Sequence, residues 1–309
     1  MSRKKNKLVC IGSNIESLVC LEQFLIKNIY ISGLITAKES IERKGSDYRN
    51  LVPFATKHNI PYYRTDSVNK PGVKEWLKDI NPDILFILGW SEMLDEEFIS
   101  ISRNYVIGSH PSDLPYGAGR APIVWTILED LRCSAVSFFR ANSKPDAGDI
   151  VLKEYFTIPI RANSYILYNI VATKLAEGFV KIFKNIKTNK LQRLKQDLSK
   201  RTVRKKRIYE DGYINFNEKA DILDRLIRAT THPFPGAYAF YKKEPITIWE
   251  SDVIVQSNNL KGTPGEILKI YDNKILVQCA DSSIWIYDFA TRDGKNINIK
   301  EFKIGEVLK

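Results

Sequence analysis

The sequence lacks the features that mark several specialised classes of protein. It has only four cysteines, with no CxxC pair and no metal-ligand spacing, so we expect reduced core thiols and no bound metal. No run approaches the roughly 18 apolar residues of a membrane span. The basic start at residues 1–7 leads directly into a strand pattern, without the features of a signal peptide. These absences predict a cytoplasmic protein with no membrane partner. The cysteines are Cys10, Cys20, Cys133 and Cys279.

Positive charge, by contrast, is in excess. The 309 residues carry 47 Lys and Arg against 36 Asp and Glu, a net charge of +11, which favours anionic partners such as nucleotides, folates or nucleic acid. Residues 184–207 hold eleven of these cations and one acid, Asp197. Such a run is usually a solvated linker, and a direct role in phosphate binding stays open as the alternative.

The first two thirds of the chain alternate between strand and helix patterns. Apolar runs predict strands at residues 8–12, 29–36, 60–63, 84–88, 105–107 and 135–139. Helices are expected between them, one opening at Gly45-Ser46-Asp47-Tyr48, and a long amphipathic helix at residues 164–183. This order is typical of an α/β fold with a Rossmann-like, doubly wound and mainly parallel sheet, whose ligands bind at the carboxyl ends of the strands. The turn after the first strand lacks GxGxxG, so no dinucleotide site is expected.

Beyond residue 204 the pattern changes to short strands. After a helix at residues 220–229 and the turn Pro233-Phe234-Pro235-Gly236, strand patterns follow at residues 237–241, 246–251, 265–270, 274–279 and 283–289. Regularly spaced short strands favour a small β-rich domain, such as an OB-like barrel. We therefore predict a catalytic domain at residues 1–204, ending in the basic linker at about 184–207, and an accessory domain at 205–309.

The chemistry is concentrated around two residues. His110 follows an expected strand directly and precedes a loop rich in glycine and proline, and Asp146 lies in an acid-bearing loop between two strands. A histidine at the carboxyl end of a parallel strand lies where substrates bind, and it can donate to a developing oxyanion and exchange a proton near neutral pH. An acid across the cleft can fix its tautomer or assist proton transfer. His58 and His232 lack a comparable setting.

The motifs themselves resemble a known family. His110-Pro-Ser-Asp-Leu-Pro-Tyr-Gly-Ala-Gly-Arg-Ala-Pro-Ile-Val-Trp, with Asp146-Ala-Gly-Asp-Ile, resembles the signature of the folate-dependent formyltransferases. That superfamily includes methionyl-tRNA formyltransferase, glycinamide ribonucleotide formyltransferase and the sugar N-formyltransferases. Weaker support comes from Ser46-Asp47-Tyr48, from Asn81-Pro82-Asp83-Ile84 and from the segment at residues 229–238, which is similar to the accessory-domain motif of the longer members.

The resemblance implies a donor and a set of roles. N10-formyltetrahydrofolate would supply the formyl group, His110 would polarise the formyl oxygen, and Asp146 would tune it and assist proton transfer. The pterin would lie against the backbone of Ile87, Leu88 and Gly89 and the loop at residues 146–149. Asp149 is either a cofactor contact or a turn cap. Trp90 and Arg120 are candidate substrate contacts, with a structural hydrogen bond the alternative for Arg120, and Trp125 is more often core than contact.

One departure from the family pattern concerns the residue two before the histidine. The family usually has an asparagine there to help bind the oxyanion, and this chain has Gly108. Loss of one such donor costs about 10²–10³ in rate in other enzymes. Ser109, Asn142 or a bound water could substitute for it. Alternatively, the chain is a folate- or nucleotide-binding protein with degenerate catalysis.

The acceptor is inferred from the same resemblance. Gly119-Arg120-Ala121-Pro122 and Gly89-Trp90-Ser91 are more similar to the sugar N-formyltransferases, which implies a nucleotide-linked amino sugar, such as a dTDP-amino sugar of lipopolysaccharide or O-antigen biosynthesis. Methionyl-tRNA is the alternative, because the basic segment could grip a tRNA backbone. The sequence leaves the sugar and the oligomeric state open, and a homodimer is one state that the accessory domain would allow.

Overall fold

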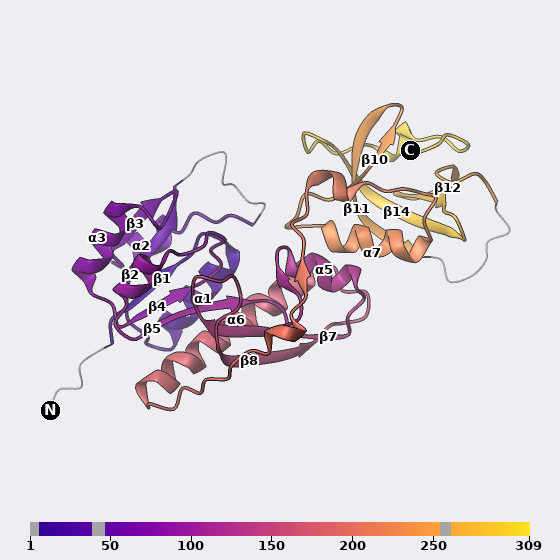
Figure 1. Ribbon diagram of the computed structural model, residues 1–309. Helices are drawn as coiled ribbons and strands as arrows, with labels where there is room; N and C mark the ends of the chain where they lie inside the picture. Colours follow the sequence, from indigo (N-terminus) through magenta and orange to yellow (C-terminus); the bar gives the residue numbers. More distant parts are fainter. Residues whose placement is uncertain (1–5, 39–46, 254–260) are drawn as a thin grey trace. The chain divides into compact units, whose positions relative to one another are not determined.

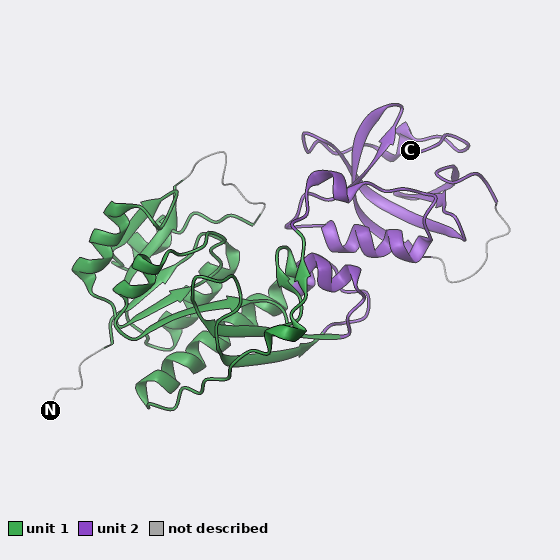
Figure 2. Cartoon of the chain, viewed as in Figure 1, with its two compact units in different colours: residues 1–122, 133–157, 168–205 green, residues 123–132, 158–167, 206–309 purple. Residues whose placement is uncertain are grey.

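The computed structural model describes residues 6–38, 47–253 and 261–309, which form two compact units (Figures 1 and 2). Unit 1 contains residues 1–122, 133–157 and 168–205, and unit 2 contains residues 123–132, 158–167 and 206–309. The boundary predicted at residue 204 lies next to the point, between residues 205 and 206, where the last segment of unit 2 begins. It assigns residues 123–132 and 158–167 to the first domain, whereas in the structure these two segments group with unit 2.

Unit 1 is built on a seven-stranded sheet in the order β3-β2-β1-β4-β5-β7-β8. The first five strands in this order are parallel, and β7 and β8 run antiparallel to their neighbours. The α/β, doubly wound and mainly parallel fold predicted from the sequence is therefore confirmed. The strands are β1 (Leu8–Ile11), β2 (Ile31–Ala37), β3 (Tyr62–Thr65), β4 (Ile84–Ile87), β5 (Tyr105–His110), β7 (Cys133–Arg140) and β8 (Ile150–Thr157).

Helices cover both faces of this sheet because its strands carry apolar side chains on both sides. On one face, rings of α1 and α6 pack against the sheet: Phe179 contacts Phe24, Phe86 and Phe138 at centroid distances of 4.8–6.5 Å. On the other face, a buried cluster that includes Val9, Leu85 and Val106 packs under α3 and α4. The helices of unit 1 are α1 (Ile15–Ile26), α2 (Val52–Lys57), α3 (Pro71–Ile80), α4 (Glu96–Ile101) and most of α6 (Ser164–Lys187), whereas α5 (Pro122–Leu128) groups almost entirely with unit 2.

The strand order reverses at β1, and this places the site. From β1 the chain moves outward through β2 to β3, then returns to β4 on the other side of β1 and continues to β5. Ligands of such sheets bind outside the carboxyl ends of the strands at the reversal. The residues that follow β1, β4 and β5 in the sequence are therefore the ones expected to line a site.

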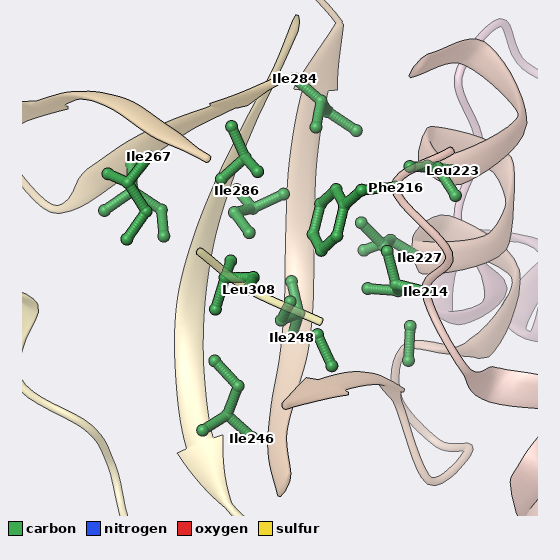
Figure 3. Packing of buried hydrophobic residues seen from close by; sticks show 14 of the residues in the cluster. Ile214, Phe216, Leu223, Ile227, Ile246, Ile248, Ile267, Ile284, Ile286 and Leu308 are labelled. Atoms are coloured by element: carbon green, nitrogen blue, oxygen red, sulfur yellow. The ribbon is translucent and has the colours of Figure 1, made fainter. Parts of the chain in front are cut away.

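Unit 2 contains a five-stranded antiparallel sheet in the order β10-β11-β14-β13-β12. The C-terminal segment closes this sheet: Phe240 of β10 and Lys309 exchange two backbone hydrogen bonds, and Ile267 of β12 bonds to Gly305 and Glu306. Its elements are α7 (Ala220–Thr230), β10 (Ala237–Tyr241), β11 (Glu244–Val253), β12 (Ile267–Tyr271), β13 (Lys274–Gln278) and β14 (Ser283–Thr291). Apolar residues of α7, including Leu223 and Ile227, pack on Ile248 and Ile286 of the sheet (Figure 3). The predicted β-rich second domain is confirmed.

Some local expectations were wrong or fall outside the described residues. The sequence pattern missed α4, and β3 begins two residues later than expected. Cys133 is exposed at the start of β7, whereas the other three cysteines are buried as expected. Gly45 and Ser46 of the helix expected from residue 45 lie outside the described residues, and the helix observed in this region begins at Val52. Among the residues that the structure covers, no helix is long and apolar enough to cross a membrane.

Candidate active site

His110 is the last residue of β5, at the carboxyl edge of the parallel part of the sheet. Its side chain is buried, with 8% of its surface exposed. Nε2 lies 2.9 Å from the carbonyl oxygen of Gly117. Because a carbonyl can only accept, Nε2 must carry the hydrogen and donate it. In the neutral ring, Nδ1 therefore holds the lone pair.

Asp146 lies on the Nδ1 side of this ring. Its Oδ1 is 3.8 Å from Nδ1, an ion-pair distance that is longer than a hydrogen bond. Its Oδ2 accepts a hydrogen bond of 3.0 Å from the backbone N–H of Gly119. Asp146 adopts the left-handed backbone conformation (φ 53°), which short polar side chains tolerate better than most. The two residues singled out from the sequence thus meet at one place.

The electrostatics of the pair favour a neutral histidine at rest. Burial lowers the pKa of His110, and the positive charges of Arg204 and Arg201 lower it further. The negative charge of Asp146 and the hydrogen bond to Gly117 act in the opposite direction without cancelling the effect of burial. A neutral ring whose Nδ1 lone pair faces a carboxylate is suited to accept a proton, because the resulting imidazolium would have a counter-ion beside it.

Gly108 lies opposite Phe139 in the β5–β7 register. A Cβ at position 108 would stand 3.2 Å from the ring of Phe139 and 3.7 Å from Cδ1 of Ile87. The phenyl ring therefore occupies the space beside residue 108 on the same face of the sheet as His110. An asparagine there would require the ring to move. Where the family usually has an asparagine side chain, this protein has a glycine, and the ring of Phe139 lies beside it.

The two side chains proposed to replace that asparagine lie in different settings. Ser109 pairs with Phe138, and directly opposed residues share a sheet face. Phe138 packs on Phe179 of α6, so Ser109 lies on the face opposite His110, without the twist that its candidate catalytic role required. Asn142 is exposed, and its Oδ1 accepts a hydrogen bond of 2.9 Å from the backbone N–H of Lys144. The register therefore argues against Ser109, and Asn142 stays a candidate.

The backbone predicted to hold the pterin is only partly available. The N–H of Leu88 donates to Ile11 at 2.7 Å, and its carbonyl accepts from the hydroxyl of Ser17, so Leu88 is committed to the fold. Pairing between β4 and β5 stops at Phe86 and Ile107, one residue before Ile87 and Gly108. Gly89 has φ +84°, and a Cβ there would meet the side chain of Asn14 at 2.5 Å. Ile87 and Gly89 remain the candidate backbone contacts.

Other candidate contacts have partners within the protein. Asp149 forms an ion pair with Arg193, which favours a structural role over a cofactor contact. Nε1 of Trp90 donates to Glu92 at 3.2 Å. Arg120 is exposed and donates to the carbonyl of Ser91 at 3.4 Å. Trp125 belongs to unit 2, where the guanidinium of Arg207 lies 5.5 Å from its ring centre.

Most cations of the basic stretch are exposed, as expected from its charge, but part of its backbone is ordered against other segments of unit 1. Residues 193–204, called here the clamp segment, run beside the loops that carry the site. Leu194 and Ile150 exchange two backbone hydrogen bonds of 2.8 Å, and β9 (Val203–Arg204) pairs in parallel with β6 (Ala118–Gly119). No motif in the sequence signalled these contacts, because they join backbone groups far apart in the chain. In the parts of the chain that the structure describes, no three His, Cys, Asp or Glu residues are grouped to hold a metal.

Comparison with known proteins agrees with this architecture. The family model "Formyl transferase" matches residues 11–183, and "Formyl transferase, C-terminal domain" matches residues 207–306. The methionyl-tRNA formyltransferase of Rickettsia massiliae is 30% identical over 288 residues, covering 92% of both chains.

Solved structures show the same fold. The N-formyltransferase of Helicobacter canadensis, solved with folinic acid and dTDP-3-aminofucose, has a TM-score of 0.67 and 19% identity over 92% of this chain and 100% of its own. HypX of Aquifex aeolicus has a TM-score of 0.68 and 15% identity over 96% of this chain, which spans 47% of the length of HypX. Since family models match both parts of the sequence, the chain belongs to the formyl transferase family, whose members are folate-dependent enzymes that use N10-formyltetrahydrofolate.

Proposed function

We propose that this enzyme transfers the formyl group of N10-formyltetrahydrofolate to the amino group of a nucleotide-linked amino deoxysugar, with His110 and Asp146 as its catalytic pair. The observation that carries the chemistry is the meeting of a buried imidazole and a carboxylate, 3.8 Å apart, at the carboxyl edge of the sheet. Two residues 36 positions apart in sequence are brought together where the fold binds ligands.

The hydrogen-bond pattern assigns the ring atoms. Nε2 is committed to the carbonyl of Gly117, so Nδ1 is the atom that takes the proton released as the neutral acceptor amine attacks the formyl carbon. The Nδ1–H so formed can face the negative charge that develops on the formyl oxygen and can return the proton to the departing folate nitrogen. Asp146 stabilises the imidazolium during this interval. Nδ1 would thus first accept the proton and, once protonated, stabilise the charge on the formyl oxygen, with Asp146 assisting the proton transfer.

The structure supports donor binding beside this pair. Ile87 and Gly108 lie just beyond the last paired residues of β4 and β5, and the loop of Asp146 and Gly148 borders the same edge. A pterin has donors and acceptors on one edge of a flat ring, which backbone groups can match. The donor's role is to present an activated formyl group, and the chain's role is to position it and to move the proton.

The choice of acceptor depends on how the positive charge is used. Several cations of the basic stretch are engaged within the chain: Arg193 with Asp149, Lys200 with Asp197, and Arg204 with the carbonyl of Pro122. Each cation engaged in this way is one fewer for gripping a long phosphate backbone, which needs many of them. A single diphosphate needs only a few. The sugar-nucleotide ligand of the Helicobacter canadensis structure is consistent with this choice.

Methionyl-tRNA is the second candidate, and a specific observation favours it. The 30%-identical relative is named methionyl-tRNA formyltransferase and is matched over 92% of its length. The family model for the C-terminal domain also matches here, at residues 207–306. Sequence similarity and the use of charge therefore point to different acceptors.

A panel of acceptors tests the proposal. Purified protein with N10-formyltetrahydrofolate is offered dTDP-, UDP- and GDP-linked amino sugars and, separately, charged initiator tRNA, and release of tetrahydrofolate is followed. We expect turnover with one class of amino sugar and none with tRNA. Turnover with tRNA alone would contradict the choice of an amino sugar and support methionyl-tRNA as the acceptor. Donor binding without turnover for every acceptor would support degenerate catalysis and contradict the proposal.

A further inference from the structure

We propose that Thr202 and Gln196 of the clamp segment are positioning residues that hold His110 and Asp146 in register. The inference rests on the catalytic roles proposed above for that pair. Its basis is a juxtaposition: one continuous segment, residues 193–204, contacts both the loop that bonds to His110 and the loop that carries Asp146. The hydrogen bonds of both side chains go to backbone groups, so each would act through the backbone.

Thr202 fixes the loop on the His110 side through three polar groups. Its N–H donates to the carbonyl of Pro115 at 3.2 Å, and its carbonyl accepts from the N–H of Ala118 at 3.0 Å. Its hydroxyl accepts from the N–H of Gly117 at 2.8 Å. Gly117 is also the residue whose carbonyl bonds to Nε2 of His110. The hydroxyl of Thr202 and the imidazole of His110 therefore bond to the same residue, Gly117.

The short strand β6 connects the clamp segment to both catalytic residues. On one edge, the N–H groups of Ala118 and Arg120 donate to Thr202 and Arg204 of the clamp segment. On the other edge, the carbonyl of Gly117 faces His110 and the N–H of Gly119 donates to Asp146. Backbone groups of successive residues in a strand point to opposite edges. A displacement of the clamp segment would therefore be transmitted to both members of the pair.

Gln196 fixes the loop on the Asp146 side. It is 8% exposed, and its Nε2 donates to the carbonyls of Asp146 at 2.9 Å and Gly148 at 2.6 Å. These two bonds span a turn in which Asp146 has positive φ and in which a Cβ at Gly148 would overlap the carbonyl oxygen of Arg140. The glutamine thus bridges a tight loop at the residue that carries the carboxylate.

The pair is sensitive to such displacement because its spacing sets the charge of the ring. The charged groups that face His110 are Asp146, from its own loop, and Arg201 and Arg204, from the clamp segment. Asp146 and the Gly117 carbonyl raise the pKa of the imidazole, whereas burial and the two arginines lower it. If the contact with Gly117 or Asp146 weakens while the ring stays buried beside Arg201 and Arg204, the pKa of His110 should fall further.

Substitutions can remove these bonds with little change in shape. Thr202→Val removes the hydroxyl from an exposed residue, and Gln196→Met removes the amide. Thr188→Val and Gln278→Met are matched controls: Thr188 bonds to the carbonyl of Lys184 at 3.0 Å, and Gln278 donates to the carbonyls of Cys279 and Ser282. Thr202→Ser keeps the hydroxyl and should behave like the original protein.

The deciding measurement is the titration of the imidazole by NMR, which needs no acceptor. The chain has only three histidines, and His58 and His232 serve as internal references for folding. We expect the pKa of His110 to fall in Thr202→Val and Gln196→Met and to stay unchanged in Thr188→Val, Gln278→Met and Thr202→Ser. With an acceptor that turns over, kcat should fall on the order of 10–100-fold in the first two variants.

An unchanged or raised pKa of His110 in both variants would overturn the inference, whatever the rates. Failure of the inference differs from failure of the proposed function. If His110→Ala retains full turnover, the catalytic pair itself is wrong. If His110→Ala is inactive while Thr202→Val and Gln196→Met titrate and turn over normally, only the positioning role is wrong.

Discussion

At the scale of one residue, the hydrogen bond from Nε2 of His110 to Gly117 leaves Nδ1 as the atom that can react. The position of His110 near the end of β5 was predictable, because the apolar run at residues 105–107 is followed closely by a histidine and a proline. Which nitrogen reacts was not, because the carbonyl of Gly117 that occupies Nε2 lies in a loop whose course the sequence does not specify. Thr202 and Gln196 carried no signal for the same reason, since their partners are backbone groups of distant residues.

The burial of His110 predicts a pH dependence of stability. The pKa of the folded state is lowered relative to the ordinary value of about 6.5, so below that value the unfolded chain binds a proton that the folded chain resists. The contribution of His110 to the free energy of unfolding should therefore decrease as the pH falls from 7 to 5. In His110→Gln, measured by urea denaturation, this contribution should be absent, so that the variant loses less stability, or gains more, than the original protein over the same pH range. An equal pH slope in both proteins would contradict the assignment of a buried, neutral ring.

Glu16 contributes to the pH dependence of stability in the opposite direction from His110. It is buried beside Asp47 at the start of α1, and burial, with the nearby charge of Asp47, raises its pKa to about 8. Between the ordinary value of 4.5 and about 8, the folded state holds a proton that the unfolded chain releases. This group therefore makes the protein progressively less stable as the pH rises through that window.

Glu16→Gln should remove this effect, because the amide stays neutral and has nearly the same shape. At pH 8.5 the variant is expected to be more stable than the original protein by up to a few kcal/mol, and the difference should shrink towards pH 5. Thermal unfolding at both pH values measures it. A stability difference that does not change with pH would show that Glu16 is ionised in the fold.

At the scale of elements, the sheet and its covering helices were predictable because burial on both faces gives continuous apolar runs. Strands β1, β4 and β5 and helix α6 follow directly from such runs. The clamp segment could not be predicted in this way. It lies within the basic stretch at residues 184–207, whose composition is typical of a solvent-exposed linker. Its ordered structure comes from the backbone pairing of β9 with β6 and of Leu194 with Ile150.

The packing of α6 on the sheet depends on a residue without a side chain. A Cβ at Gly178 would lie 2.2 Å from the ring of Phe138, which is fully buried against Phe179. Gly178→Ala should gain about 1 kcal/mol of helix propensity but lose more through overpacking, which costs about 1–3 kcal/mol. We expect a net loss of stability by urea denaturation, whereas Thr173→Ala on the exposed face of α6 should be neutral or stabilising. A stabilised Gly178→Ala protein would show that the interface has room.

At the scale of the whole molecule, the sequence indicated two folded regions, a positive charge and one boundary near residue 204, but it gave no sign of segments that return to the other unit. Residues 123–132 and 158–167 group with unit 2 although they precede the boundary in sequence. The pattern of apolar residues describes each element and not the set of neighbours that it joins. For the same reason, the net charge of +11 indicated an anionic partner without identifying it.

Salt dependence separates the two classes of acceptor at this scale. A nucleotide sugar carries about two phosphate charges, so its KM should rise only weakly between 50 and 200 mM salt. A tRNA held by six to ten phosphate contacts would lose on the order of 10³–10⁵ in affinity over that range. We expect the weak dependence, measured with the acceptor that turns over. A steep loss would favour the tRNA interpretation.

The most direct measurement of the central claim is turnover in variants of the catalytic pair. Release of tetrahydrofolate from N10-formyltetrahydrofolate is compared for the original protein, His110→Ala, Asp146→Ala and the control His232→Ala, whose imidazole stacks on Trp249 in unit 2 at 3.9 Å. With folding checked by circular dichroism, His110→Ala and Asp146→Ala should each lose at least about 10²-fold in kcat, and His232→Ala should stay near the original rate. Near-normal turnover in His110→Ala or Asp146→Ala would contradict the account.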